Sequence, residues 1–318
     1  MPSPLLVVDR LTTELRRTMA TILEEVSFAI GAGETVAIVG ESGSGKSMLA
    51  LTVMGLLPRA IRRTAGSVLL AGTDLTTLPP SEMRARRGRD LAMIFQEPLS
   101  ALNPVMRVGT QITEVLTRRR GLDSRSARAE ALRLLARVGI ARPAERFRAY
   151  PHELSGGMRQ RVMIAAALAA EPRLLIADEP TTALDVTVQA QILDLLRDLK
   201  RDHGLSLMLI THDLGVVAEV ADRVVVLYAG RVAEIAPVEA LFDAARHPYS
   251  QALLASRPRL HGPRGTLIPI DGSVPTAEAM PSGCRFRPRC PRAEPICASV
   301  PPLVAIGPDH LAACWLVR

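Results

Sequence analysis

Aromatic residues are scarce in this sequence, which holds five phenylalanines, three tyrosines and one tryptophan in 318 residues. Proteins that bind nucleic acid commonly stack bases on aromatic side chains, so this shortage argues against such a partner even though the net charge is +7. Long apolar runs are also missing: the best candidate, residues 162–170, is about half as long as a membrane-spanning helix. The first eleven residues lack the pattern of a signal peptide. We therefore expect a cytoplasmic protein that reaches a membrane only through partner proteins.

Lysine is scarce as well, because only Lys46 and Lys200 are lysines among the 39 basic residues. A chain that uses arginine almost everywhere and still places a lysine at position 46 suggests a task for a compact ammonium group. Binding phosphate in a tight pocket is such a task.

Five short apolar runs predict buried strands, at residues 35–39, 91–95, 173–177, 206–210 and 223–227. They are nearly continuous rather than alternating, as in parallel strands that are covered on both faces. Amphipathic segments lie between them. In one of these, Val188, Ile192, Leu195 and Leu199 share a helix face, and Gly204 follows as a stop signal. Strands that alternate with helices predict a doubly wound α/β fold.

The chain divides by composition into a main domain and a tail. We expect a domain over residues 1–235, in which residues 97–153 or so lack a comparable strand and form a helical subdomain. Prolines crowd the later part of residues 236–318, so we expect a small irregular C-terminal extension there.

A glycine-rich segment follows the first predicted strand. It reads GESGSGKS, fits the pattern G-x-x-x-x-G-K-[ST] and precedes a predicted helix over 48–54. Its glycines let successive N–H groups point at one anion, and the start of the helix adds positive charge there. We expect Lys46 to reach the β- and γ-phosphates of a nucleotide and Ser47 to bind Mg²⁺. The predicted nucleotide-binding residues of this phosphate loop are Gly40, Glu41, Ser42, Gly43, Ser44, Gly45, Lys46 and Ser47.

Polar side chains end three other predicted strands. Asp178 is placed to hold Mg²⁺, and Glu179 to orient or deprotonate an attacking water. Strands also end in merely solvated acids, but the phosphate loop favours the catalytic interpretation. His212 lies where α/β folds bind ligands and is a candidate contact to the γ-phosphate, although a lone histidine is more often structural. Gln96 also ends a strand and its amide is a candidate contact to both Mg²⁺ and water, but residue chemistry alone does not single it out.

A second anion site is predicted at residues 154–160, which read LSGGMRQ and open a helix over 158–170. Ser155 is a good N-cap, and Gly156 and Gly157 expose backbone N–H groups at the positive end of that helix. Glycine weakens the first turn of a helix, so the two glycines have no simple structural need, and a plain helix cap is the alternative interpretation.

Taken in order, these motifs resemble the ATP-binding subunits of ABC transporters. The set is GESGSGKS, Gln96 in IFQEP, LSGGMRQR, LLIADEP, TALD at residues 182–185 and His212 in ITHD, and it covers about residues 1–235. Each motif alone arises by chance, whereas the ordered set is specific. The resemblance implies a P-loop NTPase fold, in which an ABC nucleotide-binding domain has a RecA-like core and a helical subdomain. It also implies an ATPase that uses ATP and Mg²⁺.

In that family two subunits pack head to tail, and each ATP lies between one phosphate loop and the other subunit's LSGGM segment. The resemblance implies that Ser155, Gly156 and Gly157 contact the ATP of a partner subunit. Asp185 then signals across the interface, although it is also a good N-cap for the next helix. The implied catalytic residues are Glu179, His212 and Gln96, and the implied Mg²⁺ contacts are Ser47, Gln96 and Asp178.

One position departs from the family. Most relatives stack the adenine on an aromatic residue that aligns near Leu15, and no aromatic residue precedes Phe28 here. How adenine is held therefore stays open.

Residues 247–254, which read HPYSQALL, and the cysteine-containing tail resemble the ATPases of dipeptide and oligopeptide importers. This implies peptide import with a sister ATPase subunit in a heterodimer, two permease subunits and an extracytoplasmic solute-binding protein, at the cytoplasmic face of the inner membrane. The alternative is the same role in a nickel, metallophore or opine importer. A soluble ABC ATPase acting on nucleic acid is less expected, because the chain has one cassette and no room for a long coiled coil between Lys46 and Leu154.

All four cysteines lie in the tail, at Cys284, Cys290, Cys297 and Cys314. Their spacing is not the C-x₂-C of common zinc ribbons, and a cytoplasmic location argues against disulfides. Four thiolates can hold a [4Fe–4S] cluster, and the arginines near them would offset its negative charge. Some members of the subfamily carry such a cluster, so the resemblance favours it. Zinc, with His310 as a possible ligand, and free thiols stay open.

Overall fold

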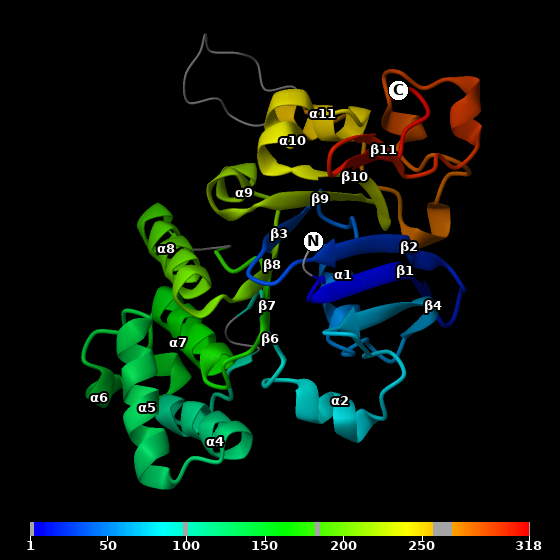
Figure 1. The fold of residues 1–318 in the computed structure, drawn as a ribbon. Helices are drawn as coiled ribbons and strands as arrows, with labels where there is room; N and C mark the ends of the chain where they lie inside the picture. Colours follow the sequence, from blue (N-terminus) through cyan, green and yellow to red (C-terminus); the bar gives the residue numbers. More distant parts are fainter. Residues whose placement is uncertain (1–2, 98–100, 182–184, 257–268, 318) are drawn as a thin grey trace. The chain divides into compact units, whose positions relative to one another are not determined.

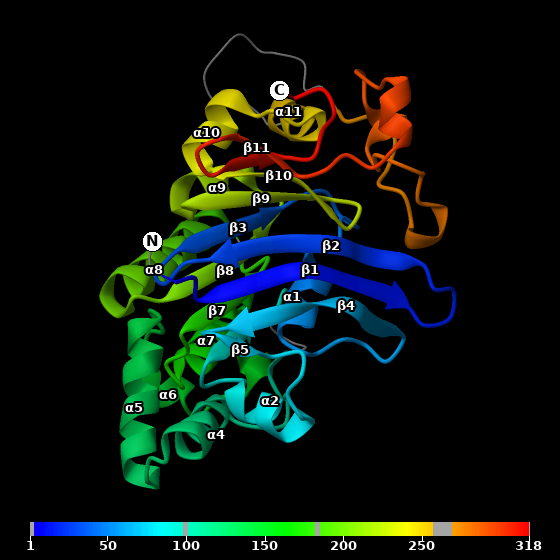
Figure 2. The ribbon, with the colours of Figure 1, turned by 45° about the vertical axis from the view of Figure 1, so that its right-hand side comes forward.

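The computed structural model describes residues 3–97, 101–181, 185–256 and 269–317 (Figures 1 and 2). The chain forms two compact units. Unit 1 consists of Met1–Thr77 together with Leu209–Arg318, and unit 2 consists of Leu78–Met208. Among the described residues, no helix is both long enough and apolar enough to cross a membrane.

Unit 1 contains a four-stranded antiparallel sheet in the order β2-β1-β4-β5, drawn in blue to cyan in Figure 2. Its strands are β1 (Leu6–Leu15), β2 (Thr21–Ile30), β4 (Ile61–Leu70) and β5 (Thr73–Asp74). Along β1 the buried side chains alternate with more exposed ones, because one face of the sheet packs against the core. The alternation shifts at Arg10, whose φ of 43° marks an irregularity where the register also changes.

A second group of strands in unit 1 runs in the order β11-β12-β10-β9-β3. β3 pairs with β9 in parallel, and β9 pairs with β10 in antiparallel fashion through a tight turn at Ala229 and Gly230. Both turn residues have positive φ, as a type I′ turn requires. These strands are β3 (Thr35–Val39), β9 (Arg223–Tyr228), β10 (Arg231–Pro237), β11 (Val304–Gly307) and β12 (His310–Ala312). The helices of unit 1 are α1 (Lys46–Val53), α9 (Leu214–Val220), α10 (Val238–Ala244) and α11 (Pro248–Ala255).

Three of the few aromatic side chains pack together in the core of unit 1. The Tyr228 ring lies 4.6 Å from that of Tyr249 and 5.1 Å from that of Phe286, measured between centroids. All three residues are almost fully buried. Since Tyr249 and Phe286 come from the predicted extension and Tyr228 ends β9, the tail contributes to the hydrophobic core of this unit.

A buried carboxylate also ties the tail to β10. Glu234 has no exposed surface, and it accepts hydrogen bonds from the backbone N–H groups of Arg246 at 2.8 Å and His247 at 2.9 Å. Its Oε1 lies 2.7 Å from Nε2 of His310 in β12. This carboxylate thus joins two segments of the tail, residues 246–247 and β12, to β10.

Unit 2 is mostly helical, with one parallel strand pair of β6 (Leu91–Ile94) and β7 (Leu174–Asp178). Between residues 97 and 153 the described residues form helices and no strand. β8 (Ser206–Thr211) runs from unit 2 into unit 1. The α-helices whose bounds lie within the described part of unit 2 are α2 (Pro80–Arg86), α4 (Val108–Arg120), α5 (Ser124–Arg137), α6 (Pro143–Arg146), α7 (Gly156–Leu168) and α8 (Val186–His203).

The structure confirms the predicted secondary structure of the α/β core. Each of the five apolar runs forms a strand, displaced by no more than about a residue at either end. The helix predicted before Gly204 is α8, and Gly204 closes it in the left-handed conformation. The division into a domain over 1–235 and an extension over 236–318 stays a prediction.

Candidate ATP site

The phosphate loop joins β3 to α1 in unit 1, in the predicted order of strand, loop and helix. Gly43 and Gly45 adopt φ values of 81° and 102°, which few other residues tolerate. A Cβ atom on Gly40 would lie 2.2 Å from the carbonyl oxygen of Leu227, so a side chain there would displace the backbone of β9. The glycines of the motif are therefore required by conformation and by close packing.

Lys46 begins α1 and is buried, with 6% of its surface exposed. Its Nζ donates hydrogen bonds to the carbonyl oxygens of Gly40 at 2.8 Å and Glu41 at 2.9 Å, so the ammonium group lies inside the curl of the loop. Ser47, the predicted Mg²⁺ contact, is exposed next to it. The Ser44 hydroxyl is buried and has no hydrogen-bond partner among the described residues. Such orphan groups are rare and commonly mark functional sites.

The two acidic residues end β7 in unit 2. Asp178 is 5% exposed, and Glu179 follows it with a φ of 47°. A left-handed glutamate is strained by about 1–3 kcal/mol and is typical of functional sites. Gln96 donates from Nε2 to Oε2 of Glu179 at 3.1 Å, so two of the predicted catalytic side chains meet. Gln160 is buried and donates to the carbonyl oxygen of Pro180 at 2.7 Å, a support that the sequence did not indicate.

The LSGGM segment, also in unit 2, forms the start of α7. Ser155 is the N-cap, and its Oγ accepts a hydrogen bond from the N–H of Met158 at 3.3 Å. Ser155 and Gly156 are exposed, whereas a Cβ atom on Gly157 would lie 2.9 Å from Val188. Packing against α8 thus requires the second glycine but gives no reason for the first.

Asp185 caps α8 by accepting from the N–H of Val188 at 2.9 Å. The other residues of TALD, 182–184, lie outside the described residues. His212 follows β8 in unit 1 and is exposed, and Leu15 is the last residue of β1. Of the predicted nucleotide-site residues, the phosphate loop and His212 belong to unit 1, and the remainder belong to unit 2.

The four cysteines of the tail line one small cavity in unit 1. Burial raises the pKa of the Cys284 and Cys290 thiols. Of the arginines near them, Arg287 lines the cavity, whereas Arg285 and Arg289 direct their guanidinium groups at acidic residues elsewhere. As the side chains lie, the described part of the chain contains no group of three or more His, Cys, Asp or Glu residues that could hold a metal ion.

His310, the possible zinc ligand, is not among the residues that line this cavity. Its Nε2 is hydrogen-bonded to Glu234 instead. A zinc site that combines the cysteines with His310 is therefore not supported by the arrangement of these side chains.

Comparisons with known proteins agree with the motifs. The sequence matches the family described as ABC transporter over residues 23–182, and the family described as Oligopeptide/dipeptide transporter, C-terminal region, over residues 233–297. It is 51% identical to the dipeptide transport ATP-binding protein DppD of Bacillus subtilis, covering 92% of this chain and 88% of that one. It is 48% identical to the oligopeptide transport ATP-binding protein OppD of Salmonella typhimurium, covering 95% of this chain and 92% of that one.

Solved structures show the same fold. The ATP-binding cassette MJ0796, solved as a dimer bound to ADP and phosphate, matches with a TM-score of 0.66 and 28% identity, over 73% of this chain and 98% of that one. The cbiO1 protein of Clostridium perfringens matches with a TM-score of 0.65 and 27% identity, over 76% of this chain and 91% of that one. The chain is therefore a P-loop ATPase that uses ATP and Mg²⁺, and it belongs to the ABC-transporter family, among the dipeptide and oligopeptide transport ATP-binding proteins.

Proposed function

We propose that this protein is the ATP-hydrolysing subunit of a bacterial importer of peptides. The observation that carries the proposal is the match of the tail, residues 233–297, to the C-terminal region of oligopeptide and dipeptide transporters, beside an ATP-binding match over residues 23–182. Relatives with about half of their residues identical over most of the chain carry names of the same kind.

The chemistry of the site residues suggests a division of roles. Lys46 binds the β- and γ-phosphates, and Ser47 and Asp178 hold Mg²⁺. Glu179 orients or deprotonates the attacking water, and its contact with Gln96 at 3.1 Å supports a shared task. His212 contacts the γ-phosphate. The other residues of the phosphate loop contribute backbone N–H groups to the same triphosphate.

A sister ATPase subunit completes the site in this proposal. The exposed start of α7, with Ser155, Gly156 and Gly157, binds the γ-phosphate of the sister subunit's ATP, and Asp185 lies at the same interface. Two permease subunits and an extracytoplasmic binding protein supply the pathway and select the solute. The ATPase itself is peripheral, at the cytoplasmic face of the inner membrane.

Reconstitution tests this function. The four subunits are assembled in lipid nanodiscs, and ATP hydrolysis is measured with the binding protein preloaded with a mixed pool of short peptides. We expect a several-fold rise over the empty binding protein, and no rise in a complex that carries Glu179→Gln. If nickel, a metallophore or an opine stimulates hydrolysis and peptides do not, that compound is the transported solute and the assignment to peptides is wrong. Full activity from this chain as a strict monomer would contradict the shared site.

We also propose that the tail binds a [4Fe–4S] cluster. The support is that all four cysteines line one cavity, which supplies the four thiolates that such a cluster needs, although the side chains would have to close on it. A cluster at this position would serve as a structural or redox group. Iron and sulfide analysis of protein purified without oxygen tests this. About four irons and four sulfides per chain in the wild type, and their loss in Cys297→Ser, would support the cluster. Zinc in place of iron would show that the cysteines bind zinc instead. Protein without any metal would show that they are free thiols.

A further inference from the structure

The cysteine-bearing segment of the tail reaches the phosphate loop through one arginine. Arg289 lies in a single turn of 3₁₀ helix, Arg287–Arg289, just before Cys290. Its Nη1 donates to Oε1 of Glu41 at 3.1 Å and its Nη2 donates to Oε2 at 3.0 Å. The side chain of Arg289 is 7% exposed. A two-pronged contact of this kind fixes both position and orientation of the carboxylate.

The guanidinium of Arg289 is itself held in place. Its Nε donates to the carbonyl oxygen of Asp271 at 2.7 Å, and its Nη2 also donates to that of Ile270 at 3.1 Å. Nη1 lies 3.3 Å from the Tyr228 hydroxyl. Because these contacts come from the tail and from β9, the arginine offers Glu41 a rigid partner rather than a mobile surface charge.

Glu41 is thereby fixed at three points. Arg289 holds its carboxylate, and the hydroxyl of Tyr249 in α11 accepts a hydrogen bond from its N–H at 2.8 Å. Its carbonyl oxygen accepts from Nζ of Lys46 at 2.9 Å. Tyr249 is fully buried. The contacts to its carboxylate and to its N–H therefore both come from the tail.

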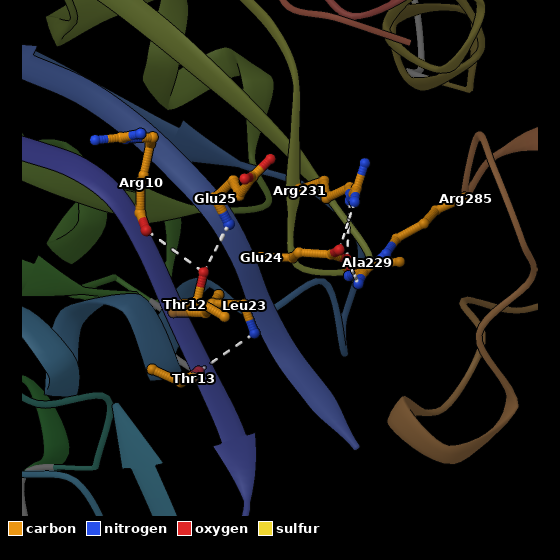
Figure 3. A network of polar contacts seen from close by, with 9 residues as sticks. All are labelled: Arg10, Thr12, Thr13, Leu23, Glu24, Glu25, Ala229, Arg231 and Arg285. Atoms are coloured by element: carbon orange, nitrogen blue, oxygen red, sulfur yellow. Dashed lines mark hydrogen bonds and ion pairs between the residues drawn. The ribbon is translucent and has the colours of Figure 1, made fainter. Parts of the chain in front are cut away.

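A second arginine of the tail holds a turn that is hydrogen-bonded to the same loop. Arg285 donates to the carbonyl oxygen of Ala229 and to the carboxylate of Glu24, which Arg231 also contacts (Figure 3). The next residue, Gly230, donates its N–H to the carbonyl oxygen of Ser44 at 2.8 Å. The turn that Arg285 holds is thus bonded directly to the phosphate loop.

We propose that Arg289 is a positioning residue for nucleotide binding, and that the cysteine segment sets the affinity for Mg–ATP through it. Arg289 acts through Glu41 in two ways. It holds the loop in the curl that presents Lys46, and it neutralises a carboxylate that would otherwise repel the phosphates of the nucleotide. The inference rests on the proposed role of the phosphate loop and is independent of the solute.

The test is the dissociation constant of Mg–ATP for the purified full-length chain, measured by calorimetry. We expect Arg289→Ala to weaken binding about 10- to 100-fold, the range for losing charge-assisted hydrogen bonds. Arg289→Lys keeps the positive charge but cannot make the two-pronged contact, so we expect a smaller loss of affinity. If the alanine variant does not fold, the lysine variant serves as the test. Arg292→Ala removes an equal charge from an exposed position of the same segment and should leave binding unchanged.

Two further readouts separate positioning from general support of the fold. Arg289→Ala combined with Glu41→Gln removes the uncompensated carboxylate, so we expect the share of the lost affinity that comes from charge repulsion to return, and the share that comes from positioning to stay lost. In the assembled transporter, Arg289→Ala should raise KM for ATP and leave kcat nearly unchanged, because Glu179 and Gln96 are untouched. Binding within twofold of wild type in both single variants, or no recovery in the double variant, would overturn the proposal. If Lys46→Ala binds Mg–ATP as tightly as wild type, the phosphate loop does not bind the nucleotide. That result would refute the proposed function of the loop and not only the role of Arg289.

Discussion

Replacing Gly230 with alanine should damage unit 1 and nucleotide binding together, and Gly72 provides a matched control. Both glycines have a φ of 79°. A Cβ atom at Gly230 would lie 1.8 Å from the carbonyl oxygen of Ile22, whereas nothing lies within 4 Å of one at Gly72. The two substitutions therefore share the same backbone strain and differ only in the close contact.

The magnitude follows from the bonds that the turn makes. A left-handed alanine costs about 1 kcal/mol at either position. At Gly230 the turn must also move, which strains its N–H bond to Ser44 at 2.8 Å and the bond that its carbonyl accepts from the N–H of Glu24 at 2.9 Å. Leaving both pairs unsatisfied adds about 2–6 kcal/mol. We expect Gly230→Ala to lose about 3–7 kcal/mol of unfolding free energy and Gly72→Ala to lose about 1 kcal/mol.

The single tryptophan makes the measurement specific. Trp315 lies in unit 1, and its Nε1 donates to the carbonyl oxygen of Ser299 at 3.2 Å, so its fluorescence in a urea titration reports the unfolding of this unit. Mg–ATP affinity should fall in Gly230→Ala and persist in Gly72→Ala. If the two variants differ by less than about 1 kcal/mol, the close contact does not matter and the reasoning is refuted.

Three other outcomes are expected. Glu179→Gln should keep Mg–ATP binding and slow hydrolysis about 10²–10⁴-fold, and near-normal phosphate release would remove the proposed base. Glu234→Ala leaves three hydrogen-bond donors without their acceptor and so should loosen the packing of the tail. Buried Cys297 should then react with a thiol reagent more than tenfold faster, which corresponds to a loss of about 1.4 kcal/mol in the free energy of local opening. An unchanged labelling rate would contradict this. Burial lowers the pKa of His247 to about 4 from its ordinary 6.5, so below pH 6.5 the unfolded chain takes up a proton that the folded protein does not. The contribution of His247 to the free energy of unfolding is therefore fully present above pH 6.5 and is lost as the pH falls toward 4. Urea titrations should show wild type losing about 3 kcal/mol more than His247→Asn over that range.

The buried parallel strands and the motifs were predictable because their signals are local. An apolar run such as 35–39 is continuous where both faces are covered, and the glycines around Lys46 follow it within a few residues. The antiparallel sheet of unit 1 was not predicted. In β1 and β2 charged and apolar residues mix, and the irregularity at Arg10 breaks the alternation that would have shown a half-buried strand.

The contacts between the tail and the phosphate loop could not be predicted from the sequence. Arg289 and Glu41 are separated by 248 residues, and Tyr249 and Glu41 by 208. A proline-rich composition indicates irregular backbone, and nothing local in it shows whether that backbone packs into a core. The arginines near the cysteines suggested compensation for a cluster, whereas the structure directs Arg285 and Arg289 at acidic partners.

The discontinuity of unit 1 has a consequence for biosynthesis. Strand β3 leaves the ribosome early, but its parallel neighbour β9 follows almost two hundred residues later. At about 5–20 residues per second, the first 77 residues wait on the order of 10 s or more for the rest of their unit. Unit 2 is continuous in sequence and emerges complete in that interval. We therefore expect the nascent phosphate loop to depend on chaperones, or on slow translation, until the C-terminal residues have been made.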